Sequence, residues 1–162
     1  MNVTIDHTGV TERLGQRYAV LGESFRGEQT YTVRKQDLLD ILTALKNDAQ
    51  LQFNYLVDIT GTDTRPLNGA YTLCYHLLSH KNKLRIRLKV LLDPGDLTIE
   101  SATSIWLGAN FQEREIWDLV GIRFLNHPDL TRLYLPDDFT GHPLRKDYSP
   151  WAQDTDIEGF RG

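Results

Sequence analysis

The side chains best suited to chemistry in this sequence are carboxylates and imidazoles in its last third. They are Glu113, Glu115, His127, Asp129 and His142. Groups of these two types transfer protons near neutral pH, so a general acid–base enzyme is the first function to consider. The sequence has no activated-nucleophile motif, no phosphate-binding glycine loop and no Gly-x-Gly-x-x-Gly fingerprint after a strand. We therefore predict no catalytic residue in this chain.

Three of these residues also have the chemistry of metal ligands. His127, Asp129 and His142 offer imidazole and carboxylate groups, which suit zinc or iron. Each histidine precedes a proline in a segment without periodicity, which is a poor way to hold ligands in place. The simpler interpretation is that both histidines hydrogen-bond backbone carbonyls and that Asp129 caps a short turn over residues 130–133. We predict no metal site and no bound cofactor.

The element that must position these residues is a helical stretch that begins near residue 101, breaks near residues 108–110 and ends at Gly121. Apolar residues recur along it at spacings of three and four and share one face with Glu113. They are Trp106, Ala109, Ile116, Trp117 and Val120. An unpaired buried carboxylate costs several kcal/mol, so Glu113 must be paired with a cation or hydrogen-bonded.

After Gly121 the chain becomes an extended ribbon, because prolines recur at intervals too short for a helix to persist. Its apolar residues are too frequent for it to stay in water, so it should pack on its own sheet, on another protein or on both. Its mixed charges would be weak ion pairs if exposed. If the ribbon is buried against a partner, its Arg–carboxylate pairs become desolvated and specific, and we favour that interpretation.

Residues 113–148 resemble the signature of the C-type subunit of respiratory complex I, the proton-pumping NADH:quinone oxidoreductase. We interpret the polar, glycine and proline positions of this signature as partner-docking or structural residues. They are Glu113, Arg114, Glu115, Asp118, Gly121, His127, Pro128, Asp129, Arg132, Gly141, Pro143, Arg145, Lys146 and Asp147. Asn126 departs from the pattern, because glycine is common at that position, and Thr131 replaces a frequent arginine.

The resemblance implies a non-catalytic structural and assembly subunit of the peripheral arm. Electrons would pass from NAD(P)H or ferredoxin to quinone, with the flavin, iron–sulfur clusters and quinone held by partner subunits. The implied partners are the large quinone-pocket subunit of the D type and cluster-bearing subunits of the B and I types. The implied location is the cytoplasmic side of the bacterial inner membrane, or the stromal side of the thylakoid membrane. A scaffold of a related membrane-bound hydrogenase and a free-standing acid–base or metal-dependent enzyme are the alternatives.

Length and composition favour one ordinary globular domain. The chain has 162 residues, 40% hydrophobic and 25% charged, and its net charge of −4 argues against a nucleic-acid binder. Cys74 is the single cysteine, which excludes an internal disulfide and an iron–sulfur cluster ligated by cysteines of this chain alone. No apolar run approaches the roughly 20 residues of a membrane span, so membrane association is expected only through the complex.

The first part of the chain predicts an α+β fold with an antiparallel or mixed sheet covered by helices. Short helices are expected over residues 8–17 and 36–46, and strands over 18–25, 29–33, 53–60, 70–79 and 83–92. Residues 62–69 should form a hairpin loop, and the last three strands an antiparallel meander. We divide the single domain, residues 1–162, into an α+β core (1–112), the signature segment (113–148) and a polar extended tail (149–162).

Two strands have clear side-chain alternation. In the strand over residues 83–92 the leucine, isoleucine and valine side chains should face the core, and Lys83, Arg85, Arg87 and Lys89 should face out. This basic row is most simply a solvated strand face, with an acidic partner surface or anionic headgroups as the functional alternative. In the strand that starts at residue 53, Phe53, Tyr55, Val57 and Ile59 should all point to one side.

Overall fold

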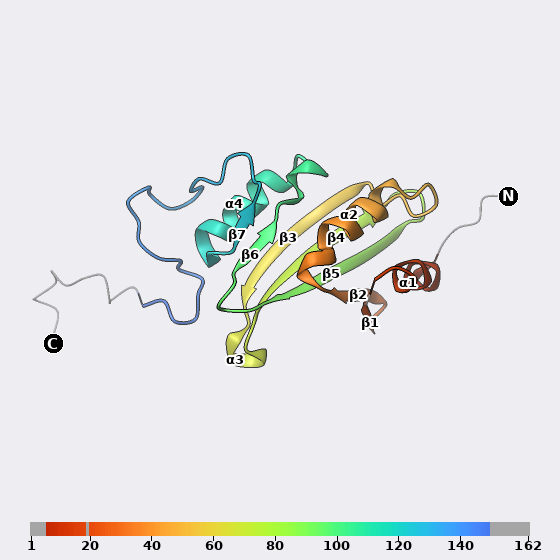
Figure 1. Ribbon diagram of the computed structural model, residues 1–162, viewed down its shortest axis with the longest axis horizontal. Helices are drawn as coiled ribbons and strands as arrows, with labels where there is room; N and C mark the ends of the chain where they lie inside the picture. Colours follow the sequence, from red (N-terminus) through yellow and green to blue (C-terminus); the bar gives the residue numbers. More distant parts are fainter. Residues whose placement is uncertain (1–5, 19, 150–162) are drawn as a thin grey trace, which may run out of the picture.

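The computed structural model describes residues 6–18 and 20–149, which form a two-layer α+β fold (Figure 1). Five strands make one sheet in the order β1-β2-β5-β4-β3. The buried side chains of the sheet and of the helices belong to one hydrophobic core, so the helices cover one sheet face. The predicted fold class is confirmed. Of the predicted tail, only Ser149 lies within the described residues.

The N-terminal part contains the predicted helix and hairpin. Helix α1 (His7–Gly15) begins at Asp6, whose carboxylate accepts a hydrogen bond from Gly9 N at 3.0 Å. Strands β1 (Leu21–Phe25) and β2 (Glu28–Val33) pair antiparallel. The turn between them uses Arg26 and Gly27 with φ of 52° and 81°, the positive values that a two-residue hairpin turn requires.

Helix α2 (Leu38–Asn47) follows a single 3₁₀ turn, η1 (Lys35–Asp37). Its buried residues recur at spacings of three and four and face the sheet. They are Leu38, Ile41, Leu42 and Leu45. The predicted helix over residues 36–46 is therefore confirmed, together with its role as a cover for the sheet.

Strands β3 (Tyr55–Asp63), β4 (Tyr71–Ser79) and β5 (Leu84–Leu92) form the predicted antiparallel meander. β5 buries every second residue from Ile86 to Leu92, as predicted. β2 lies beside β5 in parallel, which makes the sheet mixed. The predicted loop between β3 and β4 contains one helical turn, α3 (Arg65–Asn68).

The predicted side-chain phase of β3 is wrong at the start of the strand and right from Asp58 onward. The pairing register with β4 shifts between Leu56 and Asp58, as it does at a β-bulge. Such a shift moves the alternation by one residue, so Leu56 and Ile59 are both buried whereas Tyr55 is 51% exposed. From Asp58 onward the alternation is regular and ends with a buried carboxylate at Asp63.

A second, two-stranded sheet was not predicted. β6 (Thr98–Glu100) and β7 (Arg123–Leu125) pair in parallel and are each too short to show a period in the sequence. Between them come a 3₁₀ turn, η2 (Ala102–Ser104), and helix α4 (Ala109–Val120). The predicted break near residues 108–110 is thus where the α-helix begins.

The segment after β7 is the predicted ribbon. Residues 126–148, called the ribbon below, contain neither helix nor strand and pass around α4 (Figure 1). No helix within residues 6–18 or 20–149 is both long and apolar enough to cross a bilayer.

Candidate functional site

The signature residues converge on α4 and on the ribbon that surrounds it. Helix α4 packs closely against β3, because Gly61 leaves room for Ile116. A Cβ atom on Gly61 would lie 2.4 Å from Ile116 Cγ2, far inside van der Waals contact. The absence of a side chain at Gly61 therefore sets how near the helix lies to the strand.

Glu113 lies on the buried face of α4 and is hydrogen-bonded, as its position on the apolar stripe required. Its side chain has no exposed surface, and its two oxygens accept hydrogen bonds from Ser101 Oγ (2.6 Å) and Ala102 N (2.7 Å). His127 Nε2 lies 3.9 Å from Glu113 Oε2. Burial raises the pKa of Glu113 to about 7, although the two hydrogen bonds oppose the shift. A carboxyl group whose pKa lies near neutral pH thus links α4 to η2 through hydrogen bonds.

Tyr75 on β4 is the second unusual group in this part of the core. Its pKa is raised well above the usual value by burial and by the nearby charge of Glu113. Its hydroxyl has no hydrogen-bond partner within the described residues. Both groups are therefore held in their neutral forms more strongly than in water.

Asp118 fixes the middle of the ribbon. Its buried carboxylate accepts hydrogen bonds from three successive backbone amides, Leu133 (3.0 Å), Tyr134 (2.8 Å) and Leu135 (3.0 Å), and from Arg132 Nη1 (2.6 Å). Burial opposes ionisation, but these four donors outweigh it and lower the pKa of Asp118 to about 2. One side chain of α4 thus replaces the backbone partners that the ribbon lacks.

The guanidinium of Arg132 lies close to two aromatic rings. Its central carbon lies 5.8 Å from the ring centres of Trp117 and of Phe139. Arg132 also donates to the carbonyl of Phe139 at 2.5 Å, and Phe139 stacks on Tyr148. The predicted Arg–carboxylate pairing is present here, but it joins two parts of the same chain.

The C-terminal end of α4 is capped by the end of the ribbon. Arg145 Nε donates to the carbonyl of Val120 (2.7 Å), and His142 Nδ1 lies 2.9 Å from the carbonyl of Asp118. These groups satisfy carbonyls that a helix end leaves without partners. Gly121 has φ of 83°, and a Cβ atom there would lie 2.2 Å from Arg145 Nη2. Glycine is required at this position for conformation and for space.

The ribbon ends on a salt-bridge cluster that the sequence did not predict. Asp63, buried at the end of β3, binds Arg65 Nη2 (2.6 Å) and accepts a hydrogen bond from Lys146 N (2.8 Å). Arg65 also pairs with Asp147 at 3.0 Å. The Arg65 hydrogen bond holds the pKa of Asp63 well below its usual range, in spite of burial.

The start of the ribbon is held by Arg114 and by His127. Arg114 donates to the carbonyls of Thr131 (3.1 Å) and Arg132 (2.8 Å), whereas its distance to the Asp129 carboxylate is 4.0 Å. Asp129 N donates to His127 Nδ1 (3.0 Å). No helical turn forms over residues 130–133, so the prediction that Asp129 caps one is wrong.

The two histidines hydrogen-bond backbone carbonyls, as the simpler interpretation predicted. His127 Nε2 lies 3.2 Å from the carbonyl of Asn110, near the start of α4, and His142 contacts the carbonyl of Asp118, near its end. Eight residues of helix separate those carbonyls by about 12 Å. The fold therefore does not bring His127, Asp129 and His142 together, and within the described part of the chain no cluster of three such residues could hold a metal ion.

Few of the predicted docking residues remain without a contact in this chain. Glu115 and the Lys146 side chain are exposed and form no hydrogen bond or ion pair within residues 6–18 and 20–149. Pro128 is exposed, Pro143 is half-buried and Gly141 has φ of 97°. Asn126, at the position where the resemblance led us to expect glycine, has φ of 59° and donates to Glu100 Oε2 at 2.8 Å. Asparagine tolerates this left-handed conformation better than most residues.

Comparison with known proteins gives a consistent result. Residues 31–154 match the family model described as respiratory-chain NADH dehydrogenase, 30 kDa subunit. The C-type subunit of NADH-quinone oxidoreductase from Citrifermentans bemidjiense is 44% identical over 138 residues, covering 85% of this chain and 83% of the relative. The C-type subunit from a Roseiflexus species is 39% identical over 155 residues, covering 94% and 89%.

Solved structures share the fold. A trypsin-resistant fragment of Nqo5 superposes with a TM-score of 0.63 at 25% identity, covering 75% of this chain and 96% of the fragment. A chain of an archaeal membrane-bound sulfane sulfur reductase superposes with a TM-score of 0.74 at 23% identity, covering 88% and 85%. The resemblance predicted from residues 113–148 is confirmed, and the chain belongs to the family of the respiratory-chain NADH dehydrogenase 30 kDa subunit, which includes the C-type subunits of NADH-quinone oxidoreductase.

Proposed function

We propose that this chain is a structural and assembly subunit, without catalysis of its own, in the peripheral arm of a proton-pumping quinone oxidoreductase that takes electrons from NAD(P)H or ferredoxin. The names of its relatives support this choice of complex, since they are subunits of NADH-quinone oxidoreductase. The observation that carries the structural role is the bracing of the ribbon by Asp118, Arg132 and Arg145. These residues hold an irregular chain in one shape, as a docking surface needs.

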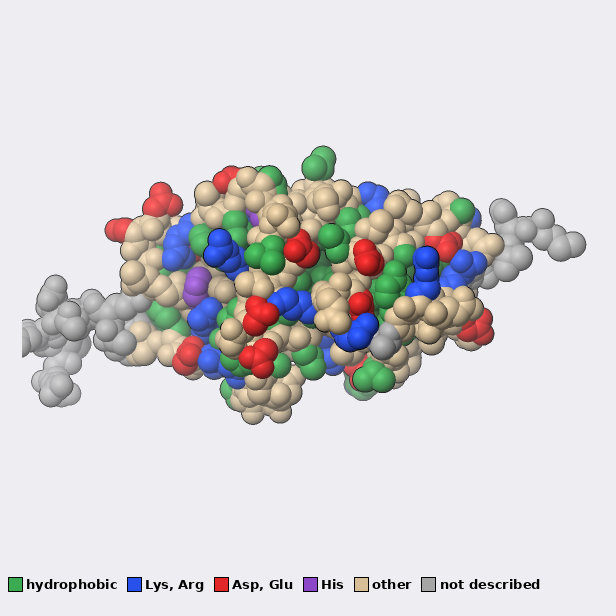
Figure 2. Space-filling model, viewed as in Figure 1, with side chains coloured by type: hydrophobic (Ala, Val, Ile, Leu, Met, Phe, Trp, Pro, Cys, Tyr) green, Lys and Arg blue, Asp and Glu red, His purple; other side chains and the backbone are tan. Residues whose placement is uncertain are grey.

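The outer surface of the ribbon has the composition of a protein interface. Leu125 just before the ribbon, and Tyr134 and Leu144 within it, are 37%, 63% and 56% exposed. Acidic, basic and apolar side chains are intermixed over α4 and the ribbon in Figure 2. A mixed surface with exposed aromatic and aliphatic side chains is typical of contacts between subunits, whereas a nucleic-acid interface would be uniformly basic.

In this proposal the ribbon docks on the large quinone-pocket subunit of the D type and on cluster-bearing subunits of the B and I types. Flavin, iron–sulfur clusters and quinone belong to those partners. The chain would lie on the cytoplasmic side of the bacterial inner membrane, or on the stromal side of the thylakoid membrane in a photosynthetic source. Any association with lipid would then depend on the complex.

The experiment is extraction of native membranes in mild detergent with a tag on this chain, followed by identification of the copurifying subunits and an assay of donor-dependent quinone reduction. Recovery of a large complex with iron–sulfur clusters supports the proposal and reveals the donor. Recovery of a lone chain refutes it.

Two variants sharpen the test. Arg145→Ala frees the end of the ribbon, and Asp129→Asn changes an exposed carboxylate with only a 4.0 Å contact to Arg114. Both should release the subunit and lower quinone reduction while the cofactors of the other subunits stay bound. A variant that assembles fully but has lost turnover would contradict a purely structural role.

A further inference from the structure

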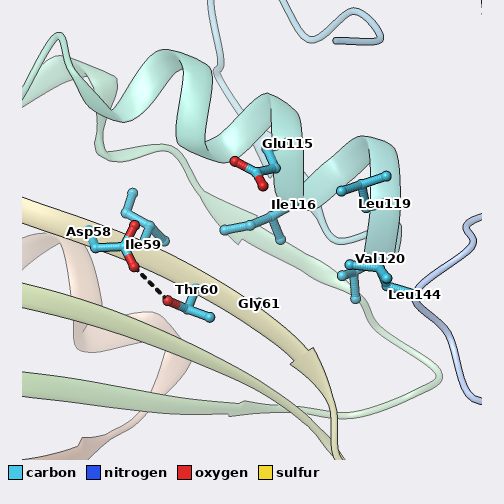
Figure 3. Close-up of a pocket in the computed structure, with 9 residues that line it drawn as sticks. All are labelled: Asp58, Ile59, Thr60, Gly61, Glu115, Ile116, Leu119, Val120 and Leu144. Atoms are coloured by element: carbon cyan, nitrogen blue, oxygen red, sulfur yellow. Dashed lines mark hydrogen bonds between the residues drawn. The ribbon is translucent and has the colours of Figure 1, made fainter. Parts of the chain in front are cut away.

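A hollow of about 210 Å³ lies between β3 and α4 (Figure 3). β3 contributes Asp58, Ile59 and Thr60, α4 contributes Glu115, and the ribbon contributes Leu144. Successive side chains of a strand point to opposite faces of the sheet. Ile59 is buried whereas Asp58 and Thr60 are exposed, so the hollow lies at the boundary between the core and the solvent, where α4 passes the last strand of the sheet.

β3 is the last strand of the sheet, and no other strand of the described chain pairs with its outer side. It is nine residues long, or about 30 Å, and the backbone donors and acceptors along its outer edge have no partner strand in the described chain. Long open edges in native proteins are covered or paired, because they otherwise pair with other chains. In a subunit of a complex, an extended segment of a neighbour is the natural cover.

The charges around the hollow specify the side chain that such a segment would carry. Asp58 accepts a hydrogen bond from Thr60 Oγ1 (2.8 Å), and Glu115 has no partner in the described chain. None of the nine residues that line the hollow is basic. Two carboxylates on opposite walls, without a cation, attract a lysine or arginine.

The size and floor of the hollow agree with one long side chain. A volume of about 210 Å³ is below the roughly 300–1,000 Å³ of ordinary small-molecule sites. Ile116 and Leu119 of α4 supply an apolar wall beside the two carboxylates. The methylene groups of lysine or arginine pack on such a wall while the cationic head reaches the carboxylates.

We propose that an extended segment of a partner subunit pairs with the edge of β3 and places a lysine or arginine in the hollow between Asp58 and Glu115. This inference rests on the proposed function, since it needs a complex that contains this chain. It adds a second docking surface, which adjoins the outer side of the ribbon at Leu144 and which selects its partner by charge.

The test is photocrosslinking within the intact, detergent-extracted complex. A photoreactive phenylalanine analogue replaces Thr60, which is exposed on β3, and in a control it replaces Thr43, which is exposed on α2. The Thr60 probe should capture one peptide of another subunit with a lysine or arginine within about two residues of the crosslink. The Thr43 probe should not capture that peptide.

A charge reversal tests the chemistry of the site. Glu115→Lys should lower recovery of the complex about tenfold, and the opposite reversal of the captured basic residue should restore it. Glu12→Lys makes the same change on α1, far from α4 in Figure 1, and should leave recovery unchanged.

The outcomes separate this inference from the proposed function. Failure of the unmodified chain to copurify with any complex overturns both. Normal copurification without a Thr60 crosslink overturns only the docking edge, as does a crosslink to a second copy of this chain or to a peptide without a basic residue. Normal recovery of the Glu115→Lys complex overturns the role of charge.

Discussion

Replacing Asp118 by asparagine removes the charge that holds the ribbon while keeping the shape of the side chain. The carboxylate is fully buried and accepts from Arg132 and from the amides of residues 133–135. Asparagine offers one acceptor oxygen and one amino group, so either Arg132 or the three amides must lose an acceptor. Breaking a buried ion pair in this way typically costs about 3–5 kcal/mol. That is a large part of the free energy of unfolding of a small domain, which is roughly 5–15 kcal/mol.

Two measurements on the purified chain report this loss. Urea unfolding should give a free energy of unfolding lower by about 3–5 kcal/mol. Hydrogen exchange should be faster at the amides of Leu133, Tyr134 and Leu135, whose protection depends on Asp118. Asp138→Asn is the matched control, because Asp138 is exposed. This substitution should change the free energy of unfolding by less than about 0.5 kcal/mol. Unfolding and exchange that both match the wild type in Asp118→Asn would refute the reasoning.

The carboxylate of Asp118 should also make the stability of the chain depend on pH in the acid range. Its pKa lies near 2 in the folded chain and at 3.8 in an ordinary aspartate, so the folded state favours the ionised form. Its contribution to stability is complete above about pH 4 and is lost as the pH falls towards 2. The wild type should lose part of its unfolding free energy over that range, and Asp118→Asn should lack that part.

Three other substitutions test the groups around α4. Glu113 has a pKa of about 7 in the folded chain instead of 4.5, so only the unfolded state gains a charge as the pH rises from 4.5 to 7. The unfolding free energy of the wild type should therefore fall by about 3 kcal/mol over that range. Urea titrations at several pH values should show that Glu113→Gln lacks this slope. Gly121→Ala should lower the unfolding free energy by about 2 kcal/mol in the same assay, because φ is 83° at this position. Gly15→Ala is the control and should not lower the stability of the chain, because a Cβ atom at Gly15 would have no atom within 4 Å. Gly61→Ala should cost about 1–3 kcal/mol in thermal melting, because the new Cβ would overlap Ile116.

Sequence patterns predicted the features that depend on near neighbours. The alternation along β5 and the apolar spacing along α2 each arise within about ten residues, and both are confirmed. The need of Glu113 for a hydrogen-bonding partner was also predictable, because burial of a carboxylate follows from its place on the apolar stripe. The identity of that partner was not, since Ser101 and the amide of Ala102 belong to a turn with no sequence period.

The anchor of the ribbon at Asp63 was missed for a traceable reason. Residues 62–69 read as a loop, so Asp63 was not recognised as the last residue of β3. If the predicted alternation is continued from Ile59, Asp63 falls on the buried side of the strand, and its carboxylate must find hydrogen-bond donors. That signal was in the sequence, whereas its pairing with Lys146, at the other end of the domain, depends on the fold alone.

The structure divides the signature into two groups that assembly experiments can separate. Asp118, Arg132 and Arg145 act within the chain, so their substitution should lower the stability of the isolated subunit and should weaken docking only as a consequence. Glu115 and the Lys146 side chain form no hydrogen bond or ion pair within the described residues, so their substitution should leave the isolated chain stable and affect only the complex. In the proposed docking role the ribbon needs both groups, because the inner one supplies the rigidity that β-strands or helices would otherwise provide.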